Sequence, residues 1–408
     1  MQKVYSMENV KLDLRNAQLI GQVNLPLSKS ICNRLLILQA QLPQLSIAQL
    51  SDADDTQILA KALQSKAAEI NLGAAGTAFR FATAFFAAQA GREVVLTGRA
   101  RMLQRPIADL VNALQSLGAD VDYVGEAGFP PLRITGKKLL GGEVGMSAST
   151  SSQFASALLL IAPSFEGGLT LRFSGEVVSK SYIRMTTALM KSAGVAVAEH
   201  EHEIAVLPAK GISPKTLFVE ADWSAAAYYF GFVALADEAT VQLNGLQENS
   251  TQGDARLVQI FEELGVKSTF KSGGLLLEKR TSQKIAKLAI NLNDNPDLAQ
   301  PLAVTCAALG IGADFRGLQT LKIKETDRLL ALKIELAKVG VDVKTTENSL
   351  SFEASKIHPP TAPFKTYEDH RMAMSFALLA CKFPVEIENP EVVRKSYPNF
   401  FLEVERLS

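Results

Sequence analysis

The sequence predicts an α/β protein built from about six copies of one repeated unit. Six helix-like segments are apolar on nearly every face and rich in small residues, and they begin near Ser30, Gly76, Ser152, Ser224, Asp297 and His370. Their starts are 46, 76, 72, 73 and 73 residues apart, so most of them recur at nearly one interval. A helix that is apolar on every face is buried. Its recurrence therefore indicates a repeated unit with an internal core.

A second pattern separates these segments, in which a short strand and a polar turn precede an amphipathic helix. The strand patterns lie at 94–98, 171–175, 241–245, 314–317 and 385–389. Apolar residues then recur at helical spacing, as at Leu110, Ala113, Leu114 and Leu117. Several of these helices end at a glycine that is followed by a new strand, as at 117–121 and 339–343. Each unit is thus predicted to contain strand, helix, strand, helix and further strands, which is an α/β arrangement.

The first unit is shorter than the others. Its buried helix starts 46 residues before the next one, against 73 in later units, so 73 − 46 = 27 residues are missing. The shortening lies between Asp55 and Leu72. We interpret it as the loss of a hairpin that lies away from any functional site.

Composition and charge restrict the class of protein. The 408 residues suggest two or three domains. The chain has 42 basic and 42 acidic residues, and this balance argues against a protein whose main partner is a nucleic acid or an anionic membrane surface. The longest apolar run, 225–236, has 12 residues, fewer than the roughly 18 that span a bilayer.

The cysteines and histidines predict neither disulfides nor a metal site. Cys32, Cys306 and Cys381 are odd in number, far apart and surrounded by apolar residues, as expected of reduced core thiols in a cytoplasmic protein. The sequence has four histidines and contains no HExxH or CxxC motif, which argues against a dedicated zinc site.

Basic residues recur near the predicted helix starts. Ser, Thr, Asp and Gly at such places have a structural explanation as N-caps, but cations there oppose the helix macrodipole. Nine cations show this pattern, and they predict a site for one or two strongly anionic small ligands. They are Lys29, Arg34, Arg80, Arg105, Lys180, Lys324, Arg328, Arg371 and Lys395.

Two acidic residues, Asp297 and Glu325, lie among these cations in the sequence. They could balance the positive charge, or they could transfer protons to and from a bound hydroxyl or carbon. No glycine-rich nucleotide-binding loop follows a strand, so nucleotide cofactors are not indicated.

These motifs together resemble those of the 5-enolpyruvylshikimate-3-phosphate (EPSP) synthase family, the 3-phosphoshikimate 1-carboxyvinyltransferases of the shikimate pathway. The resemblance covers nearly the whole chain and includes the motifs LPLSKSxxNR from Leu25, AGTAFR from Ala75, LTGxxRMxxRPI from Leu96, SSQF from Ser151, VSKxYI from Val178, QGD from Gln252, KIKETDR from Lys322, DHRMAM from Asp369 and KSYP from Lys395. Their order and spacing are more specific than any one of them.

The resemblance implies two domains, each of about three βαβαββ units, which form an inside-out α/β barrel with buried helices. It implies a discontinuous domain of residues 1–26 plus 221–408 and an inserted domain of residues 27–220, whose first unit is abbreviated near 56–72. The family's active site lies in the cleft between its two domains.

The resemblance also implies the reaction. The enolpyruvyl group of phosphoenolpyruvate passes to the 5-hydroxyl of shikimate 3-phosphate through a tetrahedral ketal phosphate, and phosphate leaves by C–O cleavage. No metal or organic cofactor is implied, nor any nucleic acid or membrane partner, and the chain is expected to be a cytoplasmic monomer. Glyphosate binds in the phosphoenolpyruvate place in this family.

The residues that match the family's motifs receive the following expected roles. Lys29, Asp297 and Glu325 are expected to be catalytic, and which of the two carboxylates performs which proton transfer stays open. Phosphoenolpyruvate is expected to contact Lys29, Gly76, Arg105, Gln153, Arg328, Arg371 and Lys395. Shikimate 3-phosphate is expected to contact Lys29, Ser30, Arg34, Ser151, Ser152, Gln153, Ser179, Tyr182, Asp297 and Lys324.

The chain departs from the family's usual pattern at several positions, which suggests a divergent member. The family usually has Asn at Ala74, Pro at Phe81, Gly at Leu27, Asn at Glu368 and Asn-Trp at Thr320-Leu321. Two alternatives are a UDP-N-acetylglucosamine enolpyruvyl transferase, which usually carries a Lys-Asn pair where Lys29-Ser30 stands, and a non-catalytic anion-binding homologue.

Overall fold

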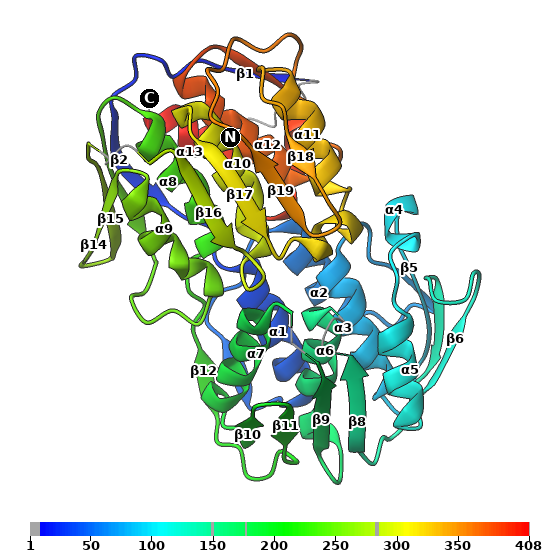
Figure 1. The fold of residues 1–408 in the computed structure, drawn as a ribbon. Helices are drawn as coiled ribbons and strands as arrows, with labels where there is room; N and C mark the ends of the chain where they lie inside the picture. The colour runs from blue at the N-terminus through cyan, green and yellow to red at the C-terminus, as the bar shows by residue number, and fades with distance from the viewer. Residues whose placement is uncertain (1–8, 148–150, 176–177, 282–284, 408) are drawn as a thin grey trace. The chain divides into compact units, whose positions relative to one another are not determined.

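The computed structural model describes residues 9–147, 151–175, 178–281 and 285–407 (Figure 1). The chain forms two compact units, which are described separately: residues 27–219, and residues 1–26 together with 220–408. Each unit has its own hydrophobic core. In the part of the chain that is described, no helix combines the length and the apolar character that a membrane span requires.

In the unit of residues 27–219, three helices are buried along most of their length: α1 (Lys29–Gln41), α3 (Gly76–Ala87) and α6 (Ser152–Ile161). The other helices are α2 (Asp54–Gln64), α4 (Ala100–Leu103), α5 (Ala108–Ser116) and α7 (Lys180–Ser192). The strands are β3 (Leu45–Ile47), β4 (Glu69–Asn71), β5 (Glu93–Thr97), β6 (Asp120–Tyr123), β7 (Leu132–Thr135), β8 (Gly142–Ser147), β9 (Leu169–Ser174), β10 (Val197–His200), β11 (Glu203–Val206) and β12 (Lys215–Leu217).

In the other unit, the buried helices are α8 (Trp223–Leu235), α10 (Ala299–Leu309) and α12 (His370–Ala377), and the remaining helices are α9 (Leu257–Glu263), α11 (Arg328–Ala337) and α13 (Phe400–Leu407). The strands are β1 (Asn9–Leu12), β2 (Leu19–Asn24), β13 (Ala239–Asn244), β14 (Val266–Lys271), β15 (Gly274–Lys279), β16 (Lys287–Asn291), β17 (Gly312–Arg316), β18 (Lys344–Thr345), β19 (Ser349–Phe352) and β20 (Val385–Glu388).

Each buried helix belongs to a repeat that contains a pair of parallel strands, and for α1 and α8 one strand of the pair comes from a distant part of the chain. The pairs are β12–β3 for α1, β4–β5 for α3, β8–β9 for α6, β2–β13 for α8 and β16–β17 for α10, and a parallel bridge joins Phe364 to Ile387 around α12. Four of the sheets have four strands, and the orders β10-β11-β9-β8 and β14-β15-β13-β2 illustrate their common plan. The predicted α/β repeat fold is therefore confirmed, and the sheets formed by the described strands do not close into a barrel by hydrogen bonding.

The shortened repeat lacks a hairpin. Helix α2 ends at Gln64 and is followed directly by β4 of the next repeat, and residues 42–72 are all described. As a result β3 pairs only with β12 in a two-stranded sheet, whereas β5 and β9 each belong to a four-stranded sheet. The buried helix α1 and the helix α2 are both retained, so the shortening removes strands and leaves the helix starts in place.

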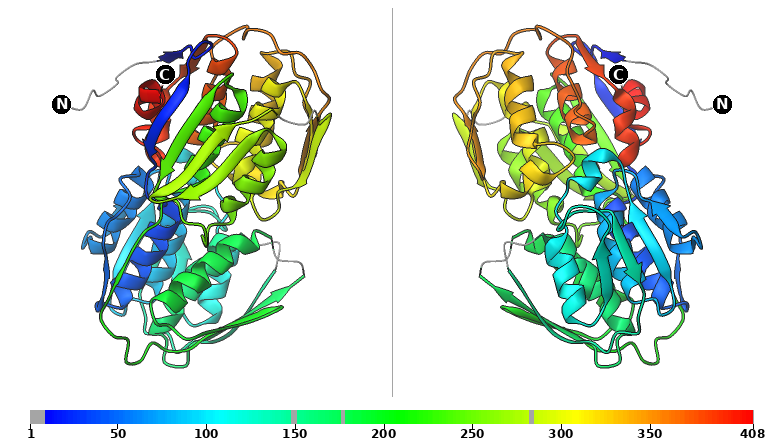
Figure 2. Two further views of the ribbon diagram at one scale, coloured as in Figure 1. Left: turned by 90° about the vertical axis from the view of Figure 1, so that its left-hand side faces the viewer. Right: turned by 90° about the vertical axis from the view of Figure 1, so that its right-hand side faces the viewer.

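The N-terminal strands complete sheets whose other strands come much later in the chain. Strand β2 pairs in parallel with β13, from Leu19 opposite Ala239 to Asn24 opposite Asn244. Strand β1 pairs antiparallel with β20, from Asn9 opposite Glu388 to Leu12 opposite Val385. Figure 2 shows the dark-blue β2 beside the green strands of its sheet.

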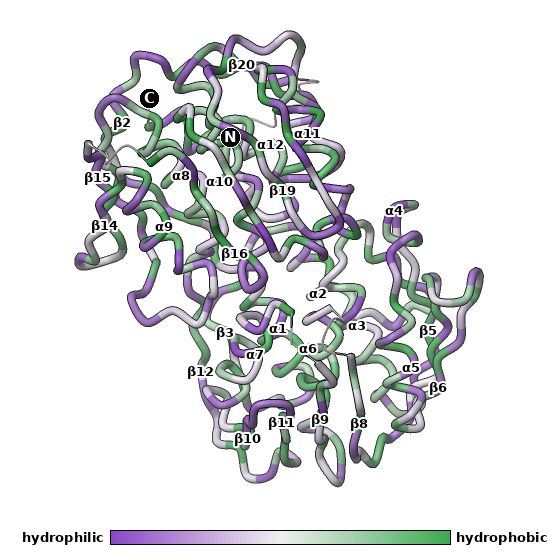
Figure 3. The backbone as a smooth tube through the Cα atoms, in the orientation of Figure 1, coloured by the Kyte–Doolittle hydropathy of each residue, from purple (hydrophilic) through white to green (hydrophobic). Residues whose placement is uncertain are grey.

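Small residues allow the buried helices to approach one another closely. A Cβ atom on Gly231 of α8 would lie 2.7 Å from Leu378 Cδ1 and 3.0 Å from Thr305 Oγ1 of α10, so glycine is required there. Aromatic side chains fill the wider gaps, and the Phe400 ring of α13 packs edge-on against Tyr228 of α8 with a centroid distance of 5.6 Å. Figure 3 shows the hydrophobic colouring along α8 and α10 that this burial requires.

Candidate active site

The residues predicted to bind the substrates form two groups, one in each unit. We call the group in residues 27–219 the Lys29 cluster: Lys29, Ser30, Arg34, Gly76, Arg105, Ser151, Ser152, Gln153, Ser179 and Tyr182. We call the group in the other unit the Arg328 cluster: Asp297, Lys324, Glu325, Arg328, Arg371 and Lys395. In both clusters the side chains come mainly from the first turns of helices or from the residues just before them.

Lys29 is the first residue of α1 and forms an ion pair that is largely withdrawn from water. Its Nζ atom lies 3.0 Å from Oδ2 of Asp55 on α2. The two side chains are 15% and 6% exposed. Asp55 therefore fixes the position of the ammonium group while leaving part of it accessible, a role that the sequence analysis did not predict.

Arg34 lies beneath two other predicted site residues. The residue is 2% exposed, and its guanidinium donates to the backbone oxygens of Ser30 at 2.8 Å and Tyr182 at 3.2 Å. It also donates to Thr186 Oγ1 at 2.7 Å and to Ser156 Oγ at 3.4 Å. Burial lowers the pKa of Arg34 to about 10, so the group stays cationic at neutral pH. Arg34 thus supports Ser30 and Tyr182 from the interior, and α1 is thereby tied to α7.

Gly76, the first residue of α3, lies directly against two guanidinium groups. A Cβ atom at this position would be 2.3 Å from Arg105 Nη1 and 2.8 Å from Arg80 Nη1. Arg80 also donates to the Gly76 carbonyl at 3.0 Å and packs on the Phe154 ring at 5.3 Å. The absence of a side chain at Gly76 therefore lets two cations meet the start of α3, which suits an anionic ligand.

Gln153 connects the starts of α6 and α3. Its Nε2 atom donates to Thr77 Oγ1 at 3.2 Å, next to Gly76. Its Oε1 atom is buried and accepts no hydrogen bond from the residues that the structure describes, which exclude 148–150. Ser151 caps α6 by accepting from the Gln153 backbone N–H at 3.4 Å. A buried amide oxygen without a donor is costly, so Gln153 is suited to accept a hydrogen bond from a ligand.

The remaining serines of the Lys29 cluster also lie at helix starts. Ser152 is the first residue of α6 and is buried. Ser179 precedes α7 in a left-handed conformation with φ of 56° and is 4% exposed.

Arg328 is the centre of the second cluster. Its guanidinium is 2% exposed and contacts Asp297 at 2.8 Å, Glu325 at 2.9 Å and Asp369 at 2.6 Å. Burial by itself would lower the pKa of Arg328, but the three carboxylates together raise it above its usual value. One buried cation therefore joins both of the acids that were predicted to transfer protons.

Two further cations hold the same acids from other directions. Arg371 Nη2 lies 3.1 Å from Asp297 Oδ2, and Lys395 Nζ lies 2.7 Å from Glu325 Oε1. Asp297 and Glu325 are 14% and 12% exposed at the side chain. Lys324, which precedes Glu325, is half-buried. Cations and acids that alternate in this way can exchange partners when an anionic ligand enters, and the carboxylates are then free to act on it.

The element boundaries correct one prediction. Lys395 was expected to start an amphipathic helix, but it is the last residue of a 3₁₀ helix, Pro390–Lys395, and α13 begins five residues later at Phe400. The Tyr397 hydroxyl of the same motif lies 2.8 Å from the Tyr229 hydroxyl of α8. This buried contact fixes the segment and so determines where Lys395 lies.

The three cysteines are free and buried, as predicted. Burial raises the pKa of Cys306 far above its usual range and that of Cys381 to about 12. Thiols with such pKa values are unreactive at neutral pH.

The turn before α12 is strained. Tyr367 and Glu368 have φ values of 53° and 55°, in the left-handed region that non-glycine residues rarely adopt. Buried Glu335 holds this turn, because it accepts from the Tyr367 hydroxyl at 2.6 Å and from the Lys365 backbone N–H at 3.0 Å. Asp369 and Arg371 follow directly, so the strained turn sets the position of two residues that contact Arg328 or Asp297.

Replacing Glu368 with asparagine is expected to stabilise the protein by about 0.5–1 kcal/mol, because asparagine tolerates the left-handed conformation better than glutamate. Thermal unfolding of the two proteins would measure the difference. Glu248→Asn provides the matched control, since Glu248 is exposed in a turn and is not among the residues with positive φ. An equal effect of both substitutions would contradict the strain argument.

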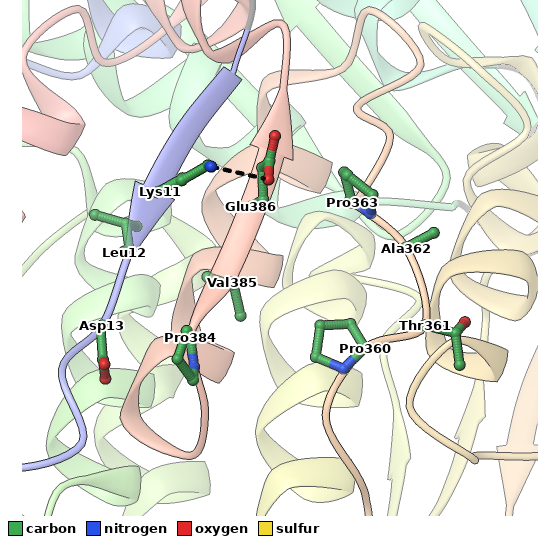
Figure 4. Close-up of a pocket in the computed structure, with 10 residues that line it drawn as sticks. All are labelled: Lys11, Leu12, Asp13, Pro360, Thr361, Ala362, Pro363, Pro384, Val385 and Glu386. Carbon is green, nitrogen blue, oxygen red and sulfur yellow. Dashed lines mark ion pairs between the residues drawn. The ribbon is translucent and has the colours of Figure 1, made fainter.

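A groove of about 390 Å³ lies elsewhere in the unit that contains the Arg328 cluster (Figure 4). None of the predicted site residues lines it. Lys11 and Glu386 form an ion pair of 3.7 Å across its rim. The lining residues come from β1 and the residue after it, from β20 and the residue before it, and from the segment before Phe364: Lys11, Leu12, Asp13, Pro360, Thr361, Ala362, Pro363, Pro384, Val385 and Glu386.

Several contacting residues were not among the predicted site residues. Asp55 and Asp369, which pair with Lys29 and Arg328, are 26 and 41 residues away from them in the chain. The sequence offered one signal for Asp369, since it precedes the apolar run of α12 and caps that helix by accepting from the Arg371 N–H at 2.8 Å. Thr77 lies in the predicted AGTAFR motif, and its position beside Gly76 could have indicated its role. Arg80 of the same motif was predicted as one of the nine cations, without a contact to a particular substrate.

Comparison with known proteins shows which family the chain resembles. A sequence model of the family described as EPSP synthase (3-phosphoshikimate 1-carboxyvinyltransferase) matches residues 42–404. A 3-phosphoshikimate 1-carboxyvinyltransferase of Bacteroides fragilis is 43% identical over 394 residues, which cover 96% of each chain. A protein of the same name from Histophilus somni is 34% identical over 423 residues, covering 95% of this chain and 96% of that one.

Among solved structures, an EPSP synthase from Acinetobacter baumannii superposes with a TM-score of 0.75 and covers 98% of both chains. Its sequence identity to this chain is 20%. This likeness supports the fold, and the closer sequence relatives support the family.

Proposed function

Because the chain belongs to the EPSP synthase family, we propose that the Lys29 and Arg328 clusters bind the two substrates of that family. The protein is an enolpyruvyl transferase of the shikimate pathway: it transfers the enolpyruvyl group of phosphoenolpyruvate to the 5-hydroxyl of shikimate 3-phosphate and releases phosphate. The family predicted from the sequence is thereby confirmed.

Phosphoenolpyruvate carries a phosphate and a carboxylate close together, so it requires several cations. We assign it Arg328, Arg371 and Lys395 from one cluster, and Lys29, Gly76, Arg105 and Gln153 from the other. The contact between Gly76 and Arg105 supports this assignment, because it joins a helix start to a guanidinium. Arginine also binds carboxylate and phosphate groups in a bidentate manner.

Shikimate 3-phosphate offers hydroxyl groups, a carboxylate and a phosphate. We assign it Lys29, Ser30, Arg34, Ser151, Ser152, Gln153, Ser179, Tyr182, Asp297 and Lys324. The serines lie at the starts of helices, where backbone N–H groups favour phosphate. Arg34 contributes by holding Ser30 and Tyr182, which it contacts through their carbonyl oxygens.

The reaction needs one proton removed and one added in its first step. The 5-hydroxyl loses its proton as its oxygen bonds to C2 of phosphoenolpyruvate, and C3 gains a proton, which gives the tetrahedral ketal phosphate. Loss of phosphate from C2 and of a proton from C3 then regenerates the enol ether. Asp297 and Glu325 are our candidates for these transfers, with Lys29 assisting.

One observation carries this assignment: buried Arg328 contacts Asp297 at 2.8 Å and Glu325 at 2.9 Å. A single cation thus brings together two carboxylates that are 28 residues apart in the chain. A phosphate-release assay with both substrates, together with calorimetry of shikimate 3-phosphate binding, tests the proposed function. Binding without turnover would favour the non-catalytic alternative.

Arg34→Ala is expected to raise the KM for shikimate 3-phosphate by about 10- to 100-fold, because charged hydrogen bonds of about 1.5–3 kcal/mol are lost beneath Ser30 and Tyr182. The KM for phosphoenolpyruvate should change by less than about threefold, since the hydrogen-bond acceptors of Arg34 described above are not assigned to that substrate. Initial-rate kinetics with each substrate varied in turn would measure both constants.

Arg184→Ala, on the exposed side of α7, is the matched control for Arg34 and should leave both constants near normal. A larger effect on phosphoenolpyruvate than on shikimate 3-phosphate would reverse the assignment of Arg34. Circular dichroism of each variant would show whether the fold is retained.

We further propose that the protein acts in the cytoplasm as a monomer. The three buried free thiols suit a reducing compartment. Size-exclusion chromatography with light scattering would test the oligomeric state.

A further inference from the structure

The motif Gln252-Gly253-Asp254 has no role in the assignments above, although it lies next to the Arg328 cluster. Asp254 belongs to a short 3₁₀ helix, Gly253–Arg256, and is 6% exposed. A carboxylate that is buried to this extent needs hydrogen-bond donors. Two of its donors lead to residues of the proposed active site.

The first donor is Ser224, the second residue of α8. Its hydroxyl donates to Asp254 Oδ2 at 2.5 Å. A serine hydroxyl has one proton, so donation to Asp254 leaves its oxygen lone pairs free to accept. Arg371 Nη2 lies 3.4 Å from this oxygen and is also 3.1 Å from Asp297 Oδ2. Asp254 therefore orients the serine that contacts Arg371.

The second donor is Asn295, whose Nδ2 atom lies 3.3 Å from Asp254 Oδ1. Asn295 is buried and stands two residues before Asp297, at the start of the 3₁₀ helix Pro296–Leu298. The Asp297 backbone oxygen in turn accepts from Arg371 Nη1 at 3.2 Å. One carboxylate oxygen of Asp254 thus holds Ser224, which contacts Arg371, and the other holds Asn295, which lies two residues before Asp297.

The charges around Asp254 work in opposite directions. Burial is the main reason that its pKa rises to about 6, and the nearby carboxylates of Asp297 and Asp222 raise it further. Arg371 and the Ser224 hydroxyl oppose this rise. Asp254 is therefore ionised at neutral pH and takes up a proton near pH 6, where a neutral acid accepts the Ser224 hydrogen bond less strongly.

We propose that Asp254 is a positioning residue for Arg371 and Asp297. It acts on Arg371 through Ser224 and on the Asp297 loop through Asn295. This inference rests on the roles proposed above for Arg371 and Asp297.

Asp254→Asn and Ser224→Ala test the inference in the full-length protein. Both are expected to raise the KM for phosphoenolpyruvate by about 5- to 30-fold, as expected when a charge-assisted contact that holds Arg371 is weakened. Ser224→Ala should leave the dissociation constant for shikimate 3-phosphate, measured by calorimetry, within about twofold of the normal value, because it does not alter the Asn295 contact. Asp254→Asn should in addition lower kcat.

The pH dependence separates positioning from a purely structural role. The ratio of kcat/KM for phosphoenolpyruvate between the original protein and Asp254→Asn should be largest near pH 7.5 and should shrink towards pH 5.5, because Asp254 itself loses its charge there. Titrations of the substrate and of other groups affect both proteins and cancel in the ratio. A constant ratio would overturn the proposal.

The stability of Asp254→Asn provides a further readout. A carboxyl whose pKa is raised on folding costs stability at pH values above that pKa, when it is ionised. Removing the charge should therefore leave the thermal midpoint at neutral pH unchanged or higher, while substrate use becomes worse. Asp13→Asn, an exposed aspartate paired with Arg15 at 2.7 Å, is the matched control and should behave normally.

Arg371→Ala separates the role proposed for Arg371 from the positioning role inferred for Asp254. If Arg371→Ala raises the KM for phosphoenolpyruvate and neither Asp254→Asn nor Ser224→Ala does, the inference about Asp254 is wrong and the proposed function stands. If Arg371→Ala itself leaves that KM unchanged, the role proposed for Arg371 is wrong, and the inference fails with it. Should Asp254→Asn not fold, Ser224→Ala decides the question, since it retains the aspartate.

Discussion

Replacing Glu325 with glutamine is expected to lower turnover by a factor on the order of 10²–10⁴, the range for loss of a general acid or base. Glutamine keeps the size of the side chain, and its single amide oxygen can accept a hydrogen bond from Arg328 or from Lys395, which lie 2.9 Å and 2.7 Å from the two carboxylate oxygens of Glu325. It cannot carry a proton between substrate atoms. Steady-state phosphate release would measure turnover, and calorimetry should show that shikimate 3-phosphate still binds.

Glu347→Gln is the matched control for this substitution. Glu347 pairs at 2.7 Å with Lys322, which lies three residues before Glu325 in the sequence. The side chain of Glu347 is 88% exposed. The control should therefore keep normal turnover. Normal turnover in Glu325→Gln would remove Glu325 from the mechanism, and Asp297→Asn would then be the decisive variant.

Arg328→Met is expected to lower the free energy of unfolding by about 3–5 kcal/mol and to abolish activity. The substitution leaves three carboxylates, Asp297, Glu325 and Asp369, without the cation at their centre, and an uncompensated buried charge costs this much. Because protonation removes those charges, the deficit relative to the original protein should shrink as the pH falls from 8 to 5. A deficit caused by packing alone would not depend on pH.

The single tryptophan of the chain makes this measurement specific to one unit. Trp223 is buried at the start of α8, in the unit that contains Arg328. Urea unfolding followed by its fluorescence therefore reports the stability of that unit. Arg316→Met is the matched control: Arg316 is 74% exposed and pairs with Asp314 at 3.3 Å, so its loss should cost less than about 1 kcal/mol.

The repeat fold was predictable because its signal is periodic and local. Helices α3, α6 and α12 begin at Gly76, Ser152 and His370, as predicted, since each has a small or capping residue immediately before a long apolar run. The strand expected at 341–343 is displaced to Lys344–Thr345, where it pairs with β19. Strand ends depend on the partner strand, which the local pattern does not contain.

The cations of the proposed site stood out in the sequence because they oppose a simple electrostatic preference at helix starts. The acids that hold them were harder to predict. Asp55 lies in an acid-rich stretch, and its own sequence neighbourhood does not distinguish it from Asp52 or Asp54. Only the packing of α2 against α1 brings its carboxylate to Lys29. Asp254 was noticed as part of a motif, but its burial and its link to Arg371 depend on three separate helices.

The pairing of β1 and β2 with late strands has a consequence for how the protein is made. At about 5–20 residues per second, β2 waits about 10–45 s after its synthesis for β13, and β1 waits about 20–75 s for β20. Residues 27–219 emerge from the ribosome in that interval and can form their own core. The nascent N-terminal strands keep unpaired edges throughout, and such edges promote aggregation. A chain truncated before β20 should therefore be a substrate for chaperones and proteases, even though the repeats that precede β20 are complete.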